Sequence, residues 1–528
     1  MVVVPVRQLM STTKYIQDVF ETIFLSSMRL RSFSVRGLLF FMLSVFLFGC
    51  KVKHSFPPLK AFPCAQGFGA SSRGGRGGDV YHVTKLLDDG SVGTLRHALD
   101  SANGPRTVVF DIGGVITLNA RLKIRTDKIT LAGQTAPGGG ITIAGYPFDI
   151  FKRSDVIIRY LRFRLGDYNA IDPHAEGDGK GNMDLWGDGG DAISVSQSND
   201  LILDHISASW GMDETVSIVR SKNITLQNSI LSEGLFHSYH PAGAHSRGGM
   251  FVAGVTDSEL VNGAGGYTIY QNLFAHHNMR NPVVGGQMYL DPGQDKKNRK
   301  FMLIDFENNV IYNWGKRSGH TARPQIKMNY INNYLIAGPS TQPKNIHTAM
   351  REENSDEGDF YIFFSGNYMD TDKDSYHNGK AVGAEAFPGF EPGEYLNEAF
   401  PFPAITFGLS AEDAYQEILR NAGASFPRDL IDKRVINHLK NQLGRLINSQ
   451  DDVGGLGYIA RGIALIDTDR DGMPDSWETK NGLDPKNSAD RNKIDISMVG
   501  YTNLEVYLDS LVRSGRNCTA DTEYQTLH

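Results

Sequence analysis

Cysteine is scarce in this sequence. The chain has 528 residues and only three cysteines, Cys50, Cys64 and Cys518, and no CxxC pair occurs among them. This spacing excludes a cysteine-based zinc or redox site. Cys64 and Cys518 are compatible with a disulfide bond and equally with two unpaired thiols.

The chain also lacks an excess of positive charge. Its formal net charge is −6 at pH 7, with 53 Lys and Arg residues against 59 Asp and Glu residues. A general nucleic-acid binder carries a strongly basic surface, so we expect no nucleic-acid partner. A local basic groove that holds an anionic ligand remains compatible with this charge.

The apolar run near the N-terminus is too short to cross a membrane. It covers residues 37–48, and Arg29, Arg31 and Arg36 precede it, whereas a transmembrane helix needs about 20 apolar residues. A basic segment followed by a short apolar run is typical of an export signal. We therefore predict that residues 1–49 are an export signal and that the rest of the chain is secreted or lies in the cell envelope.

The end of this run resembles a bacterial lipoprotein box, in which a cysteine becomes lipidated. Leu47, Phe48 and Gly49 lead directly to Cys50. On this interpretation Cys50 carries a lipid anchor to a membrane, residues 50–60 form a tether, and the protein is a periplasmic or outer-membrane lipoprotein. A plainly cleaved signal and a buried apolar helix are the alternatives.

Glycine, in contrast, is abundant, and it punctuates many short β-branched runs. The chain has 57 glycines, and from about residue 80 to about 340 apolar runs alternate with Gly, Asn and Asp. This pattern predicts strands joined by tight turns. The chain is therefore expected to be mostly β.

Several of these runs share one frame, in which an apolar segment leads into a polar pair and then into another strand. The second members of the pairs are separated by 23, 44, 37 and 24 residues; they are His205, Asn228, Asn272, Asn309 and Asn333. Repeats of about 23 residues bury a core only by stacking, and Asn tolerates the left-handed backbone of a tight corner. We therefore predict a right-handed parallel β-helix, with a β-propeller or a β-sandwich as the alternative all-β folds.

The sequence changes character after about residue 400. Helical periodicity appears in AEDAYQEILRNAG and in RVINHLKNQLGRLINS, where Val435, Leu439, Leu443 and Leu446 can share one face. We predict a β-helix domain over residues 61–400, a helical flank packed on it over 401–465, and a small C-terminal module over 466–528.

The C-terminal module contains a calcium-loop signature. The segment DTDRDGMPDSWE fits the twelve-position loop, with five acids and one backbone carbonyl as ligands: Asp467, Asp469, Asp471, Met473 (carbonyl), Asp475 and Glu478. Pro474 lies inside the loop, so the module resembles the thrombospondin type 3 loops of extracellular proteins more than a standard EF-hand. A solvated acidic loop without an ion is the alternative.

Four segments of the chain resemble polysaccharide lyase family 1, the pectate and pectin lyases, and especially its bacterial envelope members. They are AFPCAQGFGASSRGGRGG, GDAISV, LILDHISASWGMDETVSI and HHNMRNP, and the resemblance extends over residues 61–453. It implies a parallel β-helix that cleaves a uronic acid polymer by β-elimination. In that reaction a base removes the proton at C5 of a uronate, and the C4 oxygen leaves.

The resemblance also implies the identity of the base. In the family it is the arginine that opens an R-x-P motif, which here is Arg280 of Arg280-Asn281-Pro282. An arginine is an unusual base because its pKa lies above about 12. The alternative is that Arg280 only pairs with the substrate carboxylate or with a neighbouring acid.

A calcium ion bound to the substrate carboxylate acidifies the C5 proton. Asp191 and Asp213 lie 22 residues apart, which is close to one coil, so they can stack as ligands. Strand alternation turns Val216 and Ile218 inward and Ser217 outward with Asp213, and it disfavours Glu214. Ser217 stands where the family commonly has an acid, so Asp188 or Glu214 is a candidate replacement.

Cations along the groove are expected to bind the other substrate carboxylates. The candidates are Arg247, His245, Lys316 and Arg317. His237, His240 and His245 suggest a zinc site, but their spacings of three and five on a glycine-rich loop favour groove lining. The family's groove lysine has no clear counterpart, and Gly285 replaces an arginine often found five residues after the base.

Together these features predict a monomeric, calcium-dependent pectate lyase. Its substrate would be homogalacturonan, the de-esterified α-1,4-linked polygalacturonate of plant cell walls, and its products 4,5-unsaturated oligogalacturonides. A pectin lyase, a polygalacturonase-like hydrolase on the same scaffold, and a non-catalytic carbohydrate-binding β-helix are the alternatives.

Overall fold

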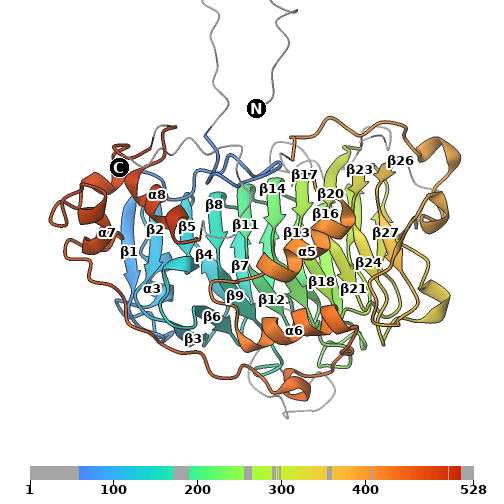
Figure 1. The fold of residues 1–528 in the computed structure, drawn as a ribbon, viewed down its shortest axis with the longest axis horizontal. Coiled ribbons are helices and arrows are strands. Elements are labelled where there is room, and N and C mark those ends of the chain that lie inside the picture. The colour runs from blue at the N-terminus through green and yellow to red at the C-terminus, as the bar shows by residue number, and fades with distance from the viewer. Residues whose placement is uncertain are drawn as a thin grey trace, which may run out of the picture. The chain divides into compact units, whose positions relative to one another are not determined.

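Short β-branched segments at regular spacing form the three long sheets of this protein, shown in a computed structural model in Figure 1. The structure describes residues 59–170, 189–254, 265–287, 293, 295, 299–353, 359–405, 408–497 and 499–512. The described residues from Leu59 onward belong to one compact unit. The predicted export signal, the lipidation site Cys50, Asp188 and Cys518 lie outside the described residues.

From β2 onward, the inner coils of the described chain each contribute one strand to each of three sheets, and the two end coils contribute fewer. Sheet 1 consists of β1 (Asp79–Val83), β2 (Arg106–Phe110), β5 (Ile129–Ala132), β8 (Ser154–Arg159), β11 (Asn199–Asp204), β14 (Lys222–Gln227), β17 (Gly265–Tyr270), β20 (Met302–Glu307), β23 (Ile326–Ile331) and β26 (Phe360–Ser365). Sheet 2 consists of β3 (Gly114–Thr117), β6 (Ile141–Ala144), β9 (Leu161–Arg164), β12 (Ser207–Ser209), β15 (Ile230–Ser232), β18 (Leu273–Ala275), β21 (Val310–Tyr312), β24 (Tyr334–Ile336), β27 (Tyr368–Asp370) and β28 (Lys380–Ala381). Sheet 3 consists of β4 (Leu122–Ile124), β7 (Phe148–Phe151), β10 (Ile193–Ser196), β13 (Glu214–Val219), β16 (Arg247–Gly254), β19 (Val283–Gln287), β22 (Gly319–Arg323) and β25 (Met350–Arg351).

The strands pair in parallel, and the register places like residues above one another. Ile193 of β10 pairs with Val216 of β13, and Ile218 of β13 pairs with Phe251 of β16. All four side chains are fully buried, as period-2 alternation requires for the inner face of a coil. The predicted parallel β-helix and the inward orientation of Val216 and Ile218 are confirmed.

Stacked amides run along one corner of the β-helix, and they include three of the five residues predicted from the repeat. Each backbone N–H and side-chain amide donates to the amide oxygen of the next coil at 2.9–3.1 Å; the ladder consists of Asn272, Asn309, Asn333 and Asn367. Ser229 continues the ladder by donating its N–H to Asn272 at 2.9 Å. His205 and Asn228 instead adopt positive φ angles of 51° and 53° at the preceding position, so the predicted frame was wrong by one residue there.

Two helices cover the outer face of sheet 2. They are α5 (Ala411–Asn421) and α6 (Leu430–Asn441), drawn in orange in Figure 1. Tyr415 and Val435 are buried with Tyr312 and Tyr334 of the sheet. The predicted helix over 434–449 is displaced, because Asp429 accepts the N-cap hydrogen bond and Gln442 ends the helix with a φ of 50°. Leu443 and Leu446 therefore do not extend the apolar face of α6.

A buried ionic cluster anchors α6 to sheet 2. Arg164 on β9 contacts Asp432 at 2.6 Å and Asp429 at 3.3 Å, and all three side chains are almost completely buried. Arg162 contacts Asp429 at 3.4 Å, and Ser207 donates to Asp432 at 2.5 Å. The helical flank is thus attached by charge as well as by apolar packing.

The C-terminal segment packs on the first coils of the β-helix. It contains α7 (Asp475–Lys480), the 3-10 helix η8 (Asp490–Asn492) and α8 (Asn503–Ser510), and Figure 1 shows α7 and α8 in red beside β1 and β2. Met473 and Leu504 pack with Ala132 of β5. The other helices within the described residues are α3 (Leu95–Asp100), η1 (Gly133–Thr135), η3 (Pro343–Asn345), η5 (Ala384–Ala386), η6 (Pro392–Glu394) and η7 (Gln450–Val453).

Two further observations concern the bonding of Cys64 and the predicted lack of a membrane-spanning helix. Cys64 is disulfide-bonded, which removes the alternative of an unpaired thiol at that position. Among the helices that the structure describes, none combines the length and the hydrophobicity needed to span a membrane.

Candidate active site

The predicted catalytic residues lie at the start of neighbouring strands in sheet 3. Asp191 precedes β10 by two residues, Asp213 precedes β13 by one, Arg247 opens β16, and Arg280 precedes β19 by three. Because consecutive strands of a parallel sheet run in the same direction, these positions meet at one edge. The register pairs Glu214 with Arg247 directly.

Three carboxylates converge at this edge. Those of Asp191, Asp213 and Glu214 each offer an oxygen within 4.8 Å of the others. The backbone N–H of Glu214 donates to Asp191 at 3.0 Å, and the Ser217 hydroxyl donates to the same carboxylate. Burial, and then the charge of Asp213, raise the pKa of Asp191 to about 7. The cluster therefore needs positive charge.

The position of Glu214 differs from the orientation that strand alternation favours. Its side chain is 1% exposed, yet its carboxylate lies beside Asp191 and Asp213 and not in the apolar interior. Glu214 is the first residue of β13 and follows a bend of the chain at Met212 and Asp213, so the alternation of the strand does not extend to it. Ser217, predicted as a calcium ligand, donates its hydroxyl proton to Asp191 in this arrangement.

Two arginines supply positive charge to the acids. Arg247 contacts Asp213 at 2.9 Å and Glu214 at 3.6 Å, and the Arg280 guanidinium forms an ion pair with Glu214. Burial lowers the pKa of both guanidinium groups, whereas the charges of Asp213 and Asp191 raise it. A lowered pKa is what an arginine base requires.

The backbone holds Arg280 in an uncommon conformation. Its φ is 64°, in the left-handed region that non-glycine residues rarely occupy. Its carbonyl accepts from the N–H of Gly249 at 2.7 Å. His277 contacts Asn281 at 2.9 Å through one ring nitrogen and Thr215 at 3.0 Å through the other. These contacts fix the R-x-P segment against β13 and β16.

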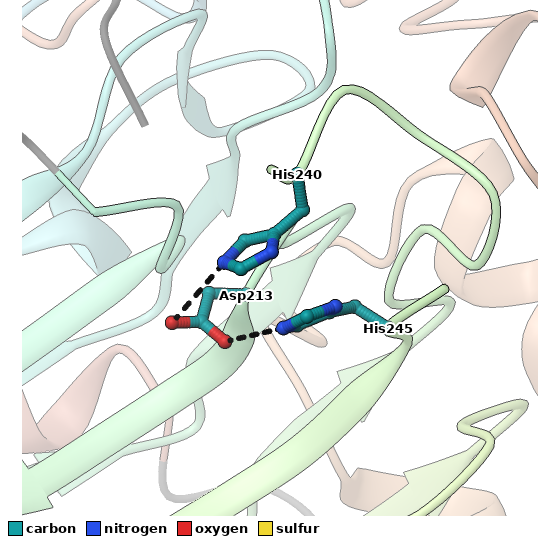
Figure 2. A group of neighbouring side chains, drawn as sticks. All are labelled: Asp213, His240 and His245. Carbon is teal, nitrogen blue, oxygen red and sulfur yellow. Dashed lines mark ion pairs between the residues drawn. The ribbon is translucent and has the colours of Figure 1, made fainter. Parts of the chain in front are cut away.

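Two histidines on the loop before β16 point at Asp213, as Figure 2 shows. The Nε2 atoms of His240 and His245 lie 3.8 Å and 3.4 Å from its carboxylate. His240 Nδ1 accepts from the N–H of Ala242 and His245 Nδ1 donates to the carbonyl of Gly243, so the proton of neutral His240 faces Asp213. Zinc binding at Nε2 of His240 would break the Ala242 hydrogen bond. These three side chains offer ligand atoms within 4.8 Å of one another, and the Ala242 hydrogen bond is the observation that disfavours zinc, so groove lining stays a prediction.

His320 on β22 lies in a cationic environment. Burial, and then the positive charges of Arg317, Arg280, Arg247 and Lys316, lower its pKa to about 3. Arg317 contacts Glu353 at 2.8 Å, whereas Lys316 is exposed and forms no ion pair with the described residues. This edge of sheet 3 is thus cationic beyond the acid cluster, and Lys316 is exposed to solvent.

The C-terminal loop brings most of its predicted ligands together. Asp467, Asp469 and Asp471 form one group, and Asp471 forms a second with Glu478 and with Asp490, which sequence reasoning missed. The fully buried Met473 follows this turn. Asp475 is not part of either group, because its carboxylate accepts from the N–H and the hydroxyl of Thr468, each at 2.7 Å.

Comparison with known proteins assigns the chain to a family through its relatives. No family model matches the chain, but proteins of known family do. It is 37% identical over 461 residues to a probable pectate lyase C of Emericella nidulans, which covers 87% of this chain and 94% of that protein. It is also 37% identical over 467 residues to a probable pectate lyase C of Aspergillus flavus, covering 87% and 96% of the two chains.

A solved pectate lyase from Paenibacillus sp. 0602 aligns with a TM-score of 0.47 at 14% identity, over 73% of this chain and all of that one. The two relatives named above are fungal, so they give no support to the predicted bacterial envelope subgroup. Their identity extends through nearly the whole of their own length. This chain therefore belongs to the pectate lyase family and is a polysaccharide lyase.

Proposed function

We propose that this protein cleaves de-esterified α-1,4-linked polygalacturonate by calcium-assisted β-elimination, with Arg280 as the base. The observation that carries the proposal is the contact between Arg280 and an acid cluster at one edge of sheet 3. A base and a cation-binding cluster side by side are what the elimination requires, because the C5 proton and the C6 carboxylate belong to the same sugar.

The residues present fit a calcium ion. Asp191, Asp213 and Glu214 offer only oxygen ligands, which calcium prefers, and their mutual repulsion is relieved by a divalent cation. Bound between these acids and the substrate carboxylate, calcium would withdraw charge and acidify the C5 proton. Ser217 adds no charge, so we propose Glu214 as the third acid.

Arg280 removes the proton in this proposal. Its neutral form takes the C5 proton, the electron pair forms the C4–C5 double bond, and the C4–O bond breaks so that the leaving sugar takes up a proton. Burial favours the neutral form of Arg280 by lowering its pKa. The fixed backbone around Arg280 keeps the guanidinium at the strand edge.

Neighbouring cations bind the other carboxylates of the polymer. Lys316 is exposed and Arg317 lies next to it, so we propose that these two residues contact substrate. Arg247 and His245 both contact Asp213, and we propose that they line the groove and orient this acid. Gly285 leaves the groove without a further arginine on β19.

The proposed substrate implies action outside the cytoplasm on plant cell-wall homogalacturonan. We therefore propose that the protein is secreted, whereas the lipid anchor at Cys50 stays a prediction from the sequence. The division into domains at residues 400 and 465, and the monomeric state, also stay predictions.

The decisive experiment measures the ultraviolet absorbance of the unsaturated product. The purified protein is incubated with polygalacturonate in calcium and in chelator, and compared with Arg280→Ala and Arg280→Lys. Arg153→Ala is the matched control, because Arg153 follows β7 in the same sheet and contacts only Asp127 among acids that the structure describes. We expect activity only with calcium, and a loss of at least about 100-fold in both Arg280 variants.

The substrate arms separate the alternatives. Product that forms faster from methylated pectin would make the protein a pectin lyase. New reducing ends without absorbance would make it a hydrolase, and binding without any cleavage would leave a carbohydrate-binding β-helix. Full activity of Arg280→Ala would refute the proposed base.

A further inference from the structure

A second acidic cluster, distinct from the one at the edge of sheet 3, lies in the C-terminal segment. The carboxylates of Asp467, Asp469 and Asp471 gather within 4.8 Å, and Asp471 joins Glu478 and Asp490 within the same limit. Asp471 is common to both groups, so the five acids form a single cluster. We refer to these five residues as the C-terminal cluster.

Several carboxylate oxygens of this cluster are buried without a hydrogen-bond donor. Neither oxygen of Glu478 accepts a hydrogen bond although the residue is 0% exposed, and the same holds for one oxygen each of Asp471 (0% exposed) and Asp490 (2% exposed). Both oxygens of Asp469 are also unpartnered. Buried carboxylates without partners are costly, so the cluster points to a bound cation.

Ion pairs within the protein do not compensate the charge of these buried carboxylates. No lysine or arginine in the described part of the chain forms an ion pair with Asp471, Glu478 or Asp490. The basic side chain that contacts the cluster among the described residues is His82 of β1, whose Nε2 lies 3.6 Å from Asp467. Five carboxylates that present only oxygen ligands suit calcium, which takes six to eight oxygens in flexible geometry.

The ligand set departs from the twelve-position loop at one acid. Asp475, at the ninth position, is held by Thr468 as the first residue of α7. Asp490 replaces it from η8, outside the loop. The carbonyl of Asp490 accepts from the Asn503 side chain at 2.9 Å, which connects the cluster to the start of α8.

The cluster is seated directly on the first coils of the β-helix. His82 Nε2 lies 3.1 Å from the carbonyl of Arg470, and its Nδ1 lies 3.0 Å from Asp111. Gly472 has a φ of +94°, and a Cβ there would meet Val80 of β1 at 3.2 Å. Fixing the loop therefore also fixes its contact with β1 and β2.

We propose that one calcium ion binds the C-terminal cluster, with Asp490 in place of Asp475, and fastens the C-terminal segment to the first coil of the β-helix. The ion connects the loop to η8 and, through Asn503, to α8. It is separate from the calcium of the proposed catalytic site, and it does not depend on the proposed function. Its ligands are Asp467, Asp469, Asp471, Glu478 and Asp490.

The test is calcium titration by calorimetry, in a parent protein whose groove acids are removed by Asp191→Asn and Asp213→Asn. Asp490→Asn and Asp475→Asn are then added separately as a matched pair. We expect the parent to bind one calcium ion, Asp490→Asn to bind it at least about tenfold more weakly, and Asp475→Asn to stay within about twofold. No calcium bound to the parent, or a loss in Asp475→Asn alone, would overturn the ligand assignment.

Thermal unfolding distinguishes a ligand from a structural acid. In chelator Asp490→Asn should melt no lower than the parent, because it removes one charge from an unpaired cluster; in calcium it should melt lower, because it loses the ion. A lower Tm in both conditions would make Asp490 a structural residue and refute the proposal.

Hydrogen exchange tests the fastening. Calcium should slow exchange of the α8 amides in the parent and not in Asp490→Asn. Exchange in α8 that ignores calcium, while the ion still binds, would refute the fastening.

Discussion

Arg280 and Glu214 form an ion pair across three neighbouring strands of sheet 3, with Glu214 opening β13 and Arg280 preceding β19. The proposed base is therefore in contact with a proposed calcium ligand. Since a carboxylate that is shared with a cation attracts an arginine less strongly, occupation of the acid cluster favours the neutral form of Arg280. In the proposed mechanism, calcium binding and proton removal are therefore coupled through Glu214.

The first prediction concerns Glu214→Gln. We expect the calcium concentration for half-maximal activity to rise about tenfold, equivalent to about 1.4 kcal/mol, because a charged ligand is lost. Calcium titrations of the initial rate measure this shift. Asp149→Asn is the control, since Asp149 lies near Asp191 but pairs with Arg121 at 2.6 Å; an equal shift in both variants would show that only long-range charge matters.

The second prediction separates two adjacent cations. Lys316 is exposed, whereas Arg317 contacts Glu353 at 2.8 Å. We expect Lys316→Ala to raise KM for polygalacturonate about tenfold with little change in kcat, because a charge-assisted hydrogen bond to substrate is worth about 1.5–3 kcal/mol. Arg317→Ala should raise KM less, because its charge is already shared. Initial rates over a range of substrate concentrations decide, and a larger effect of Arg317→Ala would contradict the assignment.

The repeat and the spacing of Asp191 and Asp213 could be predicted from the sequence because coil length alone fixes which residues stack. The orientation of the Glu214 side chain could not, since it depends on the bend of the chain that precedes β13. Asp490 was missed for a different reason. It lies twelve residues after Glu478 in a 3-10 helix, and only the packing of that helix brings it to the loop.

Local backbone signals explain the remaining differences. The end of α6 is set by the left-handed conformation of Gln442. This conformation is predictable from the sequence at a glycine, but not at a glutamine. The corner ladder was placed one residue off at His205 and Asn228 because Ser229 continues it in place of an asparagine. Motifs that carry chemistry were thus easier to place than the turns that orient them.

The third prediction concerns the anchor of α6. Asp432→Ala leaves Arg164 buried with less compensation, since the pair lies at 2.6 Å with both side chains 0% exposed. Breaking a buried pair on one side costs about 3–5 kcal/mol, so urea unfolding should show a loss of that size. Lys433→Ala, exposed on the same helix, should change stability by less than about 0.5 kcal/mol. A loss below about 1 kcal/mol for Asp432→Ala would mean that α6 contributes little to the fold.

The last prediction concerns the pH dependence of stability through Glu307 on β20. Burial, and then the charge of Asp305, raise the pKa of Glu307 to about 9 from a usual value near 4.5. Between these two values the folded protein binds a proton that the unfolded chain releases, so stability falls as the pH rises from about 4.5 to 9.

Glu307→Gln removes this titration while it keeps a hydrogen-bonding side chain. We expect the variant to melt at the same temperature as the parent at pH 4 and several degrees higher at pH 9, measured by calorimetry across that range. Glu398→Gln, at an exposed position, should follow the parent at every pH. The difference in melting temperature between the variant and the parent should depend on pH only if the pKa of Glu307 is raised in the folded protein. An equal difference at pH 4 and at pH 9 would show that Glu307 is already ionised in the native protein and would contradict this prediction.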